Sequence, residues 1–159
     1  MMTIDRRSFL AALALAGAGG VQSGLAAGKP IVVIHKDASC GCCGAWADHI
    51  AAAGFPTRIV EDIRINAIKA RLGVPAAMRS CHTAEVDGYV LEGHVPAAAL
   101  VRLLADRPAV RGLAVPGMPV GSPGMEVPGA PAETFDVMAF GHDASSVFMR
   151  FQGSTQIDG

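Results

Sequence analysis

The sequence contains few charges, few aromatic side chains and no long apolar run. Charged residues make up 17% and aromatic residues 5%, with one tryptophan, one tyrosine and a formal net charge of −1. Without a basic stripe or a row of aromatic side chains, the composition argues against a nucleic-acid partner. The longest apolar stretch is too short and too rich in glycine to span a bilayer, so we expect no permanent membrane anchor.

Hydrophobic residues are plentiful by contrast, at 51% of the 159 residues. That content and length suit one compact domain with processing or tail segments, and we expect it to be a monomer. We expect the domain to span residues 28–152 and to be followed by a flexible tail at residues 153–159.

The first 27 residues have the pattern of a cleaved signal peptide. A basic start precedes an apolar Ala/Leu/Gly stretch, and small residues lead to Ala27. The segment from Arg6 to Leu10 is a twin arginine followed by Phe-Leu, which resembles the signal of the twin-arginine (Tat) export route. The alternative is a general secretory signal that happens to carry two arginines. Both predict a mature protein in the periplasm or cell envelope.

The mature chain alternates between strand and helix patterns. We expect strands at 31–34, 57–60, 83–86 and 89–91, and a closing β-hairpin at 135–140 and 147–151. We expect three helices: one at 45–53, one that begins after a cap at Asp62, and one that begins at Pro96. The order of strand, cysteine motif, helix, strand, helix, hairpin and helix is that of a thioredoxin-like α/β domain.

Glycine and proline recur from residue 112 to residue 131, together with Met118 and Met125. Regular helices and central strands do not tolerate this composition. A loop of this length in a compact protein is usually functional or a linker.

Three of the four cysteines stand within four residues, as Cys40, Cys42 and Cys43, and the fourth is Cys81. Two structural disulfides are the ordinary expectation for an envelope protein, but the crowding of the first three argues against them. A strand that runs into Cys-x-x-Cys at a helix N-terminus favours reactive thiolates. Cys40 and Cys43 could then exchange between dithiol and disulfide, or the cysteines could bind a soft metal.

Three features favour the metal. Cys42 is a thiol that a disulfide exchanger does not need. Cys81 and His82 stand just before the predicted hairpin, where the thioredoxin order brings them close to the first three cysteines. Met118 and Met125 supply thioethers, which select reduced copper. Zinc is the alternative metal, since it would be satisfied by cysteine and histidine alone.

The remaining histidines differ in their surroundings. His94 lies between glycine and proline in a defined turn, which makes it a further candidate ligand. His35 ends the first strand, and we expect it to support the ligands from behind. His49 and His142 are expected on the solvated surface. Trp46 is expected to serve packing.

Taken together, these motifs are similar to those of the CopG-type family, a group of envelope proteins associated with copper resistance and long described as a domain of unknown function. The resemblance covers roughly residues 30 to 128. It rests on Cys40–Trp46, Arg71–Pro75, Ser80–Ala84, Gly88–Pro96, Gly112–Pro119 and Gly121–Glu126.

This resemblance implies a thioredoxin-like fold that binds copper through cysteine, methionine and histidine and interconverts Cu(I) and Cu(II). Copper ions and periplasmic copper-transfer proteins are then the expected partners. A thiol–disulfide oxidoreductase that uses Cys40 and Cys43 is the rival hypothesis, and a zinc domain that binds another protein is the third. The resemblance is compatible with a metal-binding protein and with a copper oxidoreductase, and it does not identify a reaction.

Overall fold

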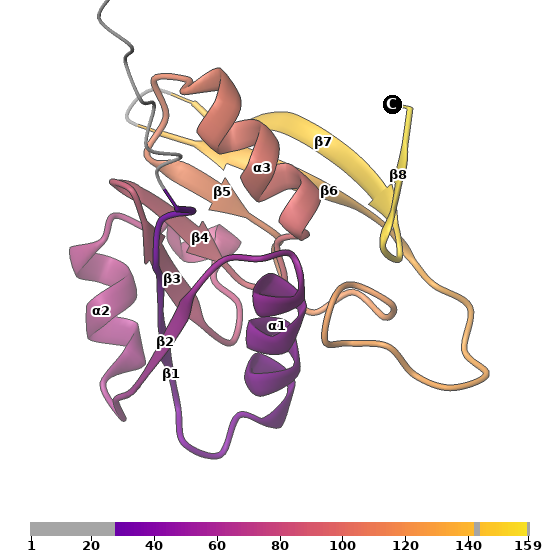
Figure 1. Ribbon diagram of the computed structural model, residues 1–159, viewed down its shortest axis with the longest axis horizontal. Coiled ribbons are helices and arrows are strands. Elements are labelled where there is room, and N and C mark those ends of the chain that lie inside the picture. The colour runs from indigo at the N-terminus through magenta and orange to yellow at the C-terminus, as the bar shows by residue number, and fades with distance from the viewer. Residues whose placement is uncertain (1–27, 142–143, 159) are drawn as a thin grey trace, which may run out of the picture.

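The structure, a computed structural model, describes residues 28–141 and 144–158. The predicted signal peptide at 1–27 and His142 lie outside the described residues. Within the described part, eight strands form one sheet and three α-helices pack against it (Figure 1). None of the helices described there is both long enough and apolar enough to cross a membrane.

The N-terminal part of the domain follows the predicted order of elements. It comprises β1 (Val32–Lys36), α1 (Gly41–Ala52), β2 (Thr57–Glu61), α2 (Ile65–Arg71), the short 3-10 helix Ala76–Met78, β3 (Thr83–Val86), β4 (Tyr89–Glu92) and α3 (Ala97–Asp106). Strand β1 is parallel to β2 and antiparallel to β3, and β3 and β4 form the predicted hairpin. The mixed α/β class predicted from the sequence is therefore confirmed.

The C-terminal part continues the same sheet through β5 (Gly112–Ala114), β6 (Thr134–Phe140), β7 (Ser146–Gln152) and β8 (Thr155–Ile157). Strand β5 lies between β4 and β6, although the loop was predicted to begin at residue 112. Glycine is needed at 112 because a Cβ there would overlap the backbone of Val90. The tail predicted to be flexible also differs, because β8 pairs with β7.

The helices cover both faces of the sheet. Helices α1 and α3 share one core with residues such as Ile34, Leu91 and Leu113. Helix α2 packs on the opposite face, where Ile68 and Val90 belong to a smaller core. Figure 1 shows α1 and α3 on one side of the sheet, α2 on the other, and the long loop after β5 passing beside α1. Because side chains alternate along a strand, neighbouring residues of β1, β3 and β4 face different helices.

Helix α1 begins earlier than predicted, directly at the cysteine motif. Cys40 is its N-cap residue and Gly41 its first helical residue. The start of α2 also differs, because Arg64 and not Asp62 is the N-cap residue. The Asp62 carboxylate accepts a hydrogen bond of 2.8 Å from the backbone N–H of Arg64, which makes a turn before the helix.

Candidate metal centre

The first part of the candidate centre lies at the N-terminus of α1. A disulfide joins Cys40 to Cys43, with 5.5 Å between their Cα atoms, and leaves Cys42 as a thiol. The Sγ atom of Cys42 lies 3.6 Å from the Sγ atom of Cys40. Cys43 is buried, whereas Cys40 and Cys42 are half-buried and open to reaction. The structure thus represents the oxidised form of the predicted Cys-x-x-Cys pair.

Cys81 joins this sulfur group to two histidines. Its Sγ atom lies 3.9 Å from that of Cys42, 3.2 Å from Nδ1 of His82 and 3.1 Å from Nε2 of His94. Among the described residues, two groups of side chains are close enough to hold a metal ion, with ligand atoms within 4.8 Å of one another. One group contains the four cysteines, the other contains Cys81, His82 and His94, and Cys81 belongs to both.

His94 is held by a backbone carbonyl in the long loop. Its Nδ1 donates a hydrogen bond of 2.8 Å to the carbonyl oxygen of Pro123, so the lone pair of its Nε2 faces Cys81. Burial lowers the pKa of His94, against the opposing effects of the Pro123 carbonyl and Glu126. The imidazole is therefore neutral at neutral pH, which is the form that binds metals.

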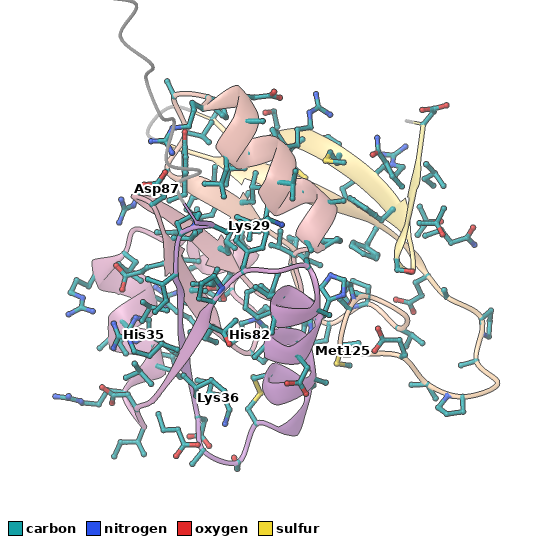
Figure 2. The ribbon with its side chains drawn as sticks, in the orientation of Figure 1. Lys29, His35, Lys36, His82, Asp87 and Met125 are labelled. Carbon is teal, nitrogen blue, oxygen red and sulfur yellow. A yellow bond between two sulfur atoms is a disulfide. The ribbon has the colours of Figure 1, made fainter. Side chains whose placement is uncertain are left out.

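His82 is completely buried between α1 and the sheet, as Figure 2 shows. Its ring packs 4.4 Å from the ring of Trp46 and 5.1 Å from that of His94. Burial, helped by His94 and Lys69, lowers the pKa of His82 well below its ordinary value of 6.5. Within the described residues Nε2 of His82 has no hydrogen-bond partner, while Nδ1 faces Cys81. Nδ1 is therefore the nitrogen that His82 presents to a metal ion beside Cys81.

Burial also raises the pKa of the Cys81 thiol to about 11, with a further contribution from nearby Cys42. The metal-free centre therefore keeps a proton on Cys81, and this thiol can donate to the neighbouring imidazoles. A metal ion that binds here must displace that proton, because the thiolate is the ligand.

A tight turn of the long loop packs against the first turns of α1. Gly124 has a φ of +85°, and a Cβ there would lie 2.8 Å from both the Cys42 carbonyl oxygen and the Trp46 nitrogen. The backbone N–H of Gly121 donates to the carbonyl of Met125 at 2.8 Å, which closes the turn. Met125 is thereby held beside α1, where it is labelled in Figure 2, and its side chain is half-buried.

Met118 lies at the other end of this loop segment and is 53% exposed. It follows Gly117, whose carbonyl oxygen accepts a hydrogen bond from the Ser80 hydroxyl. Since Ser80 precedes Cys81, this hydrogen bond links the loop next to Met118 to the segment that carries Cys81. The structure therefore places Met125 beside the helix and leaves Met118 exposed in the loop.

The expectation for His35 was wrong. His35 lies on the face of the sheet that α2 covers, opposite the face that carries α1 and the cysteines (Figure 2). Its Nε2 contacts the Glu85 carboxylate at 2.8 Å. The strand end was close to the motif in sequence, but the alternation of β1 directs this side chain away from the ligands.

His49 also differs from its prediction, because it is half-buried and not a solvated surface residue. Its Nε2 accepts a hydrogen bond of 3.0 Å from the backbone N–H of Ala97, which satisfies a free donor at the start of α3. Trp46 serves packing as predicted, since it is fully buried and its indole N–H donates to the Val95 carbonyl at 2.9 Å.

Two supporting groups escaped the sequence-based reasoning. Lys36 is 6% exposed, and its Nζ donates a hydrogen bond of 2.9 Å to the carbonyl oxygen of Asp37 in the loop that leads to Cys40. Lys69 and Glu92 form a buried ion pair on the α2 face. The helical spacing could have revealed Lys69, because it stands four residues after Ile65 on the face that α2 buries.

The donor set suits a soft metal ion. Thiolate sulfur and neutral imidazole nitrogen are ligands of copper and zinc, and thioethers beside them favour reduced copper. The nearest sulfur and nitrogen atoms lie 3.1 to 3.9 Å apart, which suits neighbouring ligands of one metal ion. The geometry and chemistry define a mixed α/β protein with a cysteine–histidine centre at the N-terminus of a helix.

Comparison with known proteins agrees with this class. Two solved structures, described as copper resistance protein CopG in form 2 and form 1, are each 42% identical and have TM-scores of 0.73. The match to form 2 covers 77% of this chain and 98% of the form 2 chain. The match to form 1 covers 79% of this chain and 99% of the form 1 chain. A family model described as a protein of unknown function, DUF411, matches residues 78–125. No curated protein sequence matches.

The chain therefore belongs to the CopG copper-resistance family, as the motifs of the sequence indicated.

Proposed function

We propose that this protein binds copper in the bacterial cell envelope and serves copper resistance or copper handling. The observation that carries the proposal is the position of Cys81, which is shared by a group of four sulfurs and a group of one sulfur and two imidazoles. Copper is the substrate in this account, and the cysteines, histidines and methionines of one face of the domain receive it.

The ligands we assign are Cys40, Cys42, Cys43, Cys81, His82, His94, Met118 and Met125. Cys81 and His94 are the best supported, because Nε2 of His94 already faces the Cys81 sulfur and Nδ1 is held by Pro123. Met125 is supported by the turn that packs on α1. Met118, which is exposed in the loop, suits the entry or exit of copper.

A thioredoxin-like fold agrees with this assignment. The order β2-β1-β3-β4 at one end of the sheet, with the cysteine motif at the start of α1, is the arrangement expected for that fold. The helix N-terminus then faces the thiolates with free backbone N–H groups and the positive end of its dipole.

The disulfide supports a role in interconverting Cu(I) and Cu(II). Reduction of two Cu(II) ions takes two electrons, which the reduced Cys40 and Cys43 supply as they form their S–S bond and release two protons. The oxidised product of that step is the form described here. Reduction of the disulfide by an external dithiol would restore both thiolates as ligands.

We further propose export of the protein through a cleaved twin-arginine signal at residues 1–27, with periplasmic copper-transfer proteins as partners. This route carries folded proteins, so that copper could be inserted before export. The copper-resistance relatives and the composition of the first residues support this location.

The second candidate function is thiol–disulfide exchange. The Cys40–Cys43 disulfide with its half-buried Cys40 favours it. Rapid reduction of a test disulfide that requires Cys40 and Cys43 but not Cys42 would support this function over copper handling.

Competition between metals tests the primary proposal. The reduced protein is titrated without oxygen with Cu(I) and with Zn²⁺, and the ions bound per chain are counted. We expect Cu(I) to displace Zn²⁺ from the protein. We expect the double variant Met118→Leu/Met125→Leu to lower the affinity for Cu(I) but not the affinity for Zn²⁺. If copper binds no better than zinc and the double variant changes nothing, copper handling is wrong and the zinc alternative gains support.

A further inference from the structure

We propose that the buried ion pair of Lys69 and Glu92 positions the Cys81 side of the metal centre from the opposite face of the sheet. This role rests on the proposed function, since it concerns the geometry of the same centre. Neither residue is a ligand in this account. Both act through the backbone and side chains of the segment that carries Cys81 and His82.

The pair is enclosed by protein on all sides. The exposed fractions of the Lys69 and Glu92 side chains are 2% and 0%, and their Nζ and Oε1 atoms are 2.6 Å apart. Lys69 also donates to the Thr83 hydroxyl at 2.9 Å, and that hydroxyl donates to the other carboxylate oxygen of Glu92. Because an uncompensated buried charge is very costly, neither partner can turn away, and the carboxylate has one fixed position.

The fixed carboxylate holds both ends of the Cys81–His82 dipeptide. The backbone N–H of Ser80, one residue before Cys81, donates to Oε1 of Glu92 at 2.6 Å. The hydroxyl of Thr83, one residue after His82, donates a hydrogen bond to Oε2 of Glu92. The dipeptide that carries two candidate ligands is thus clamped from the α2 face, while its ligand atoms lie on the α1 face.

Glu92 also connects the Cys81–His82 segment to His94. Glu92 is the last residue of β4, and the N–H of the following Gly93 donates to the His82 carbonyl at 3.0 Å. Gly93 has a φ of +71°, and a Cβ there would lie only 2.6 Å from the Cβ of Ser80. This close contact and the Ser80–Glu92 bond together set the 3.1 Å separation between Cys81 Sγ and His94 Nε2.

Stability alone does not account for an ion pair at this place. The surrounding core on the α2 face is apolar, with Ile68, Leu72 and Val90 among its members. Well-packed apolar side chains often replace a buried ion pair with no loss of stability, or with a gain. What they cannot replace is the directional acceptor for the Ser80 N–H and the Thr83 hydroxyl.

Two double variants separate the hydrogen bonds from the charges. Lys69→Met/Glu92→Gln removes both charges, but the glutamine amide can still accept from the Ser80 N–H and donate to the Thr83 hydroxyl. Lys69→Met/Glu92→Leu removes the charges and the hydrogen bonds together. Asp136→Leu/Arg150→Met, which removes a half-buried ion pair between β6 and β7, is the control for the loss of an ion pair elsewhere in the sheet.

Each variant is measured with and without metal, in the reduced state. The affinity for Cu(I) is determined by competition with a chelating dye, and the copper–thiolate absorption band is recorded. In metal-free protein, the rate of Cys81 alkylation and the hydrogen exchange of the Ser80 amide report the geometry directly.

We expect the leucine variant to lose about 10- to 100-fold in Cu(I) affinity, to shift the absorption band and to alkylate faster at Cys81. The glutamine variant and the control should remain close to the wild type in all these measurements. The proposal is overturned if the leucine variant keeps wild-type affinity and alkylation, or if the glutamine variant loses as much as the leucine variant. If no form binds Cu(I) while alkylation still separates the two variants, the positioning role stands and the proposed function fails.

Thr83→Val gives a second test, which applies even when the leucine variant does not fold. It keeps both charges and removes the hydroxyl bridge, whereas Thr83→Ser restores the hydroxyl. We expect faster Cys81 alkylation and a shifted absorption band in the valine variant only. Equal behaviour of the valine and serine variants would contradict the proposal.

Discussion

The Sγ atom of Cys81 lies 3.1 Å from Nε2 of His94, and the other ring nitrogen of His94 donates to the Pro123 carbonyl. A sulfur on the segment before β3 and a nitrogen on the segment after β4 are thus aligned by a loop that joins β5 to β6. This relationship makes the candidate metal centre a product of three chain segments and not of the Cys40–Cys43 motif alone.

Replacement of His94 tests this alignment. We expect His94→Ala to lower the affinity for Cu(I) by more than about tenfold, because a preoriented imidazole beside Cys81 is lost. His35→Ala is the matched control, since it removes another buried histidine from the opposite face of the sheet. Competition with a Cu(I)-chelating dye measures both. Equal losses in the two variants would contradict a specific role of His94.

Gly124 tests the contact between the long loop and α1. We expect Gly124→Ala to lower the free energy of unfolding by about 1 to 3 kcal/mol, since it adds strain at a positive φ and a Cβ against the Cys42 carbonyl. It should also weaken Cu(I) binding by displacing Pro123 and Met125.

Gly129→Ala is the matched control, because Gly129 also has a positive φ of +81° but has open space around it. We expect it to share the backbone strain without the loss of copper affinity. Urea unfolding and the copper competition assay separate the two effects. A Gly124 variant that binds copper like the Gly129 variant would show that the loop contact does not shape the centre.

The disulfide predicts a dependence of the copper count on the redox state. With Cys40 and Cys43 joined, Cys42 and Cys81 are the remaining free thiols. We expect the oxidised protein to bind fewer Cu(I) ions than the reduced protein, and Cys40→Ser/Cys43→Ser to bind the lower number in either state. Copper counts on matched oxidised and reduced samples measure this. The same count in both states of the wild type would argue that this pair does not ligate.

The buried histidines predict a loss of stability in mild acid. Burial lowers the pKa values of His82 and His94, so below about pH 6.5 the unfolded chain binds protons that the folded chain does not. The free energy of unfolding of the metal-free protein should therefore fall with falling pH, by up to about 1.4 kcal/mol per pH unit for each histidine.

His82→Phe, which keeps a ring against Trp46, should make that fall shallower by about the contribution of one histidine. Denaturant unfolding between pH 7.5 and 5 measures both proteins. The interpretation fails if the wild-type stability does not change over this range, or if the variant has the wild-type slope.

The order of elements and the members of the two candidate cysteine–histidine groups could be predicted from the sequence. Apolar periodicity located the strands and helices, and the run of cysteines at a strand–helix junction indicated reactive sulfur. Cys81 and His82 were predicted near it from the thioredoxin-like order of elements, and β3, which they precede, pairs with β1 in the structure.

The errors arose where neighbouring residues in sequence face different sides of the fold. His35 is close to Cys40 along the chain, but its strand directs it toward α2. Gly112 carried the signal of a loop, although its small size is what lets β5 approach β4.

The Pro123 acceptor and the pairing of Lys69 with Glu92 could not be predicted for a different reason. The Pro123 acceptor is a backbone carbonyl, and every residue has one, so no side chain marks it. Lys69 and Glu92 are 23 residues apart, and only the packing of α2 on the sheet brings them together.

The copper count and Cu(I) affinity of Cys81→Ser, measured without oxygen on the reduced protein, test the central claim most directly. Because Cys81 belongs to both ligand groups, we predict that this variant loses more copper and more affinity than Cys42→Ser, which disturbs the sulfur group alone. A Cys81→Ser protein that binds copper with the wild-type count and affinity would contradict a metal centre built around Cys81.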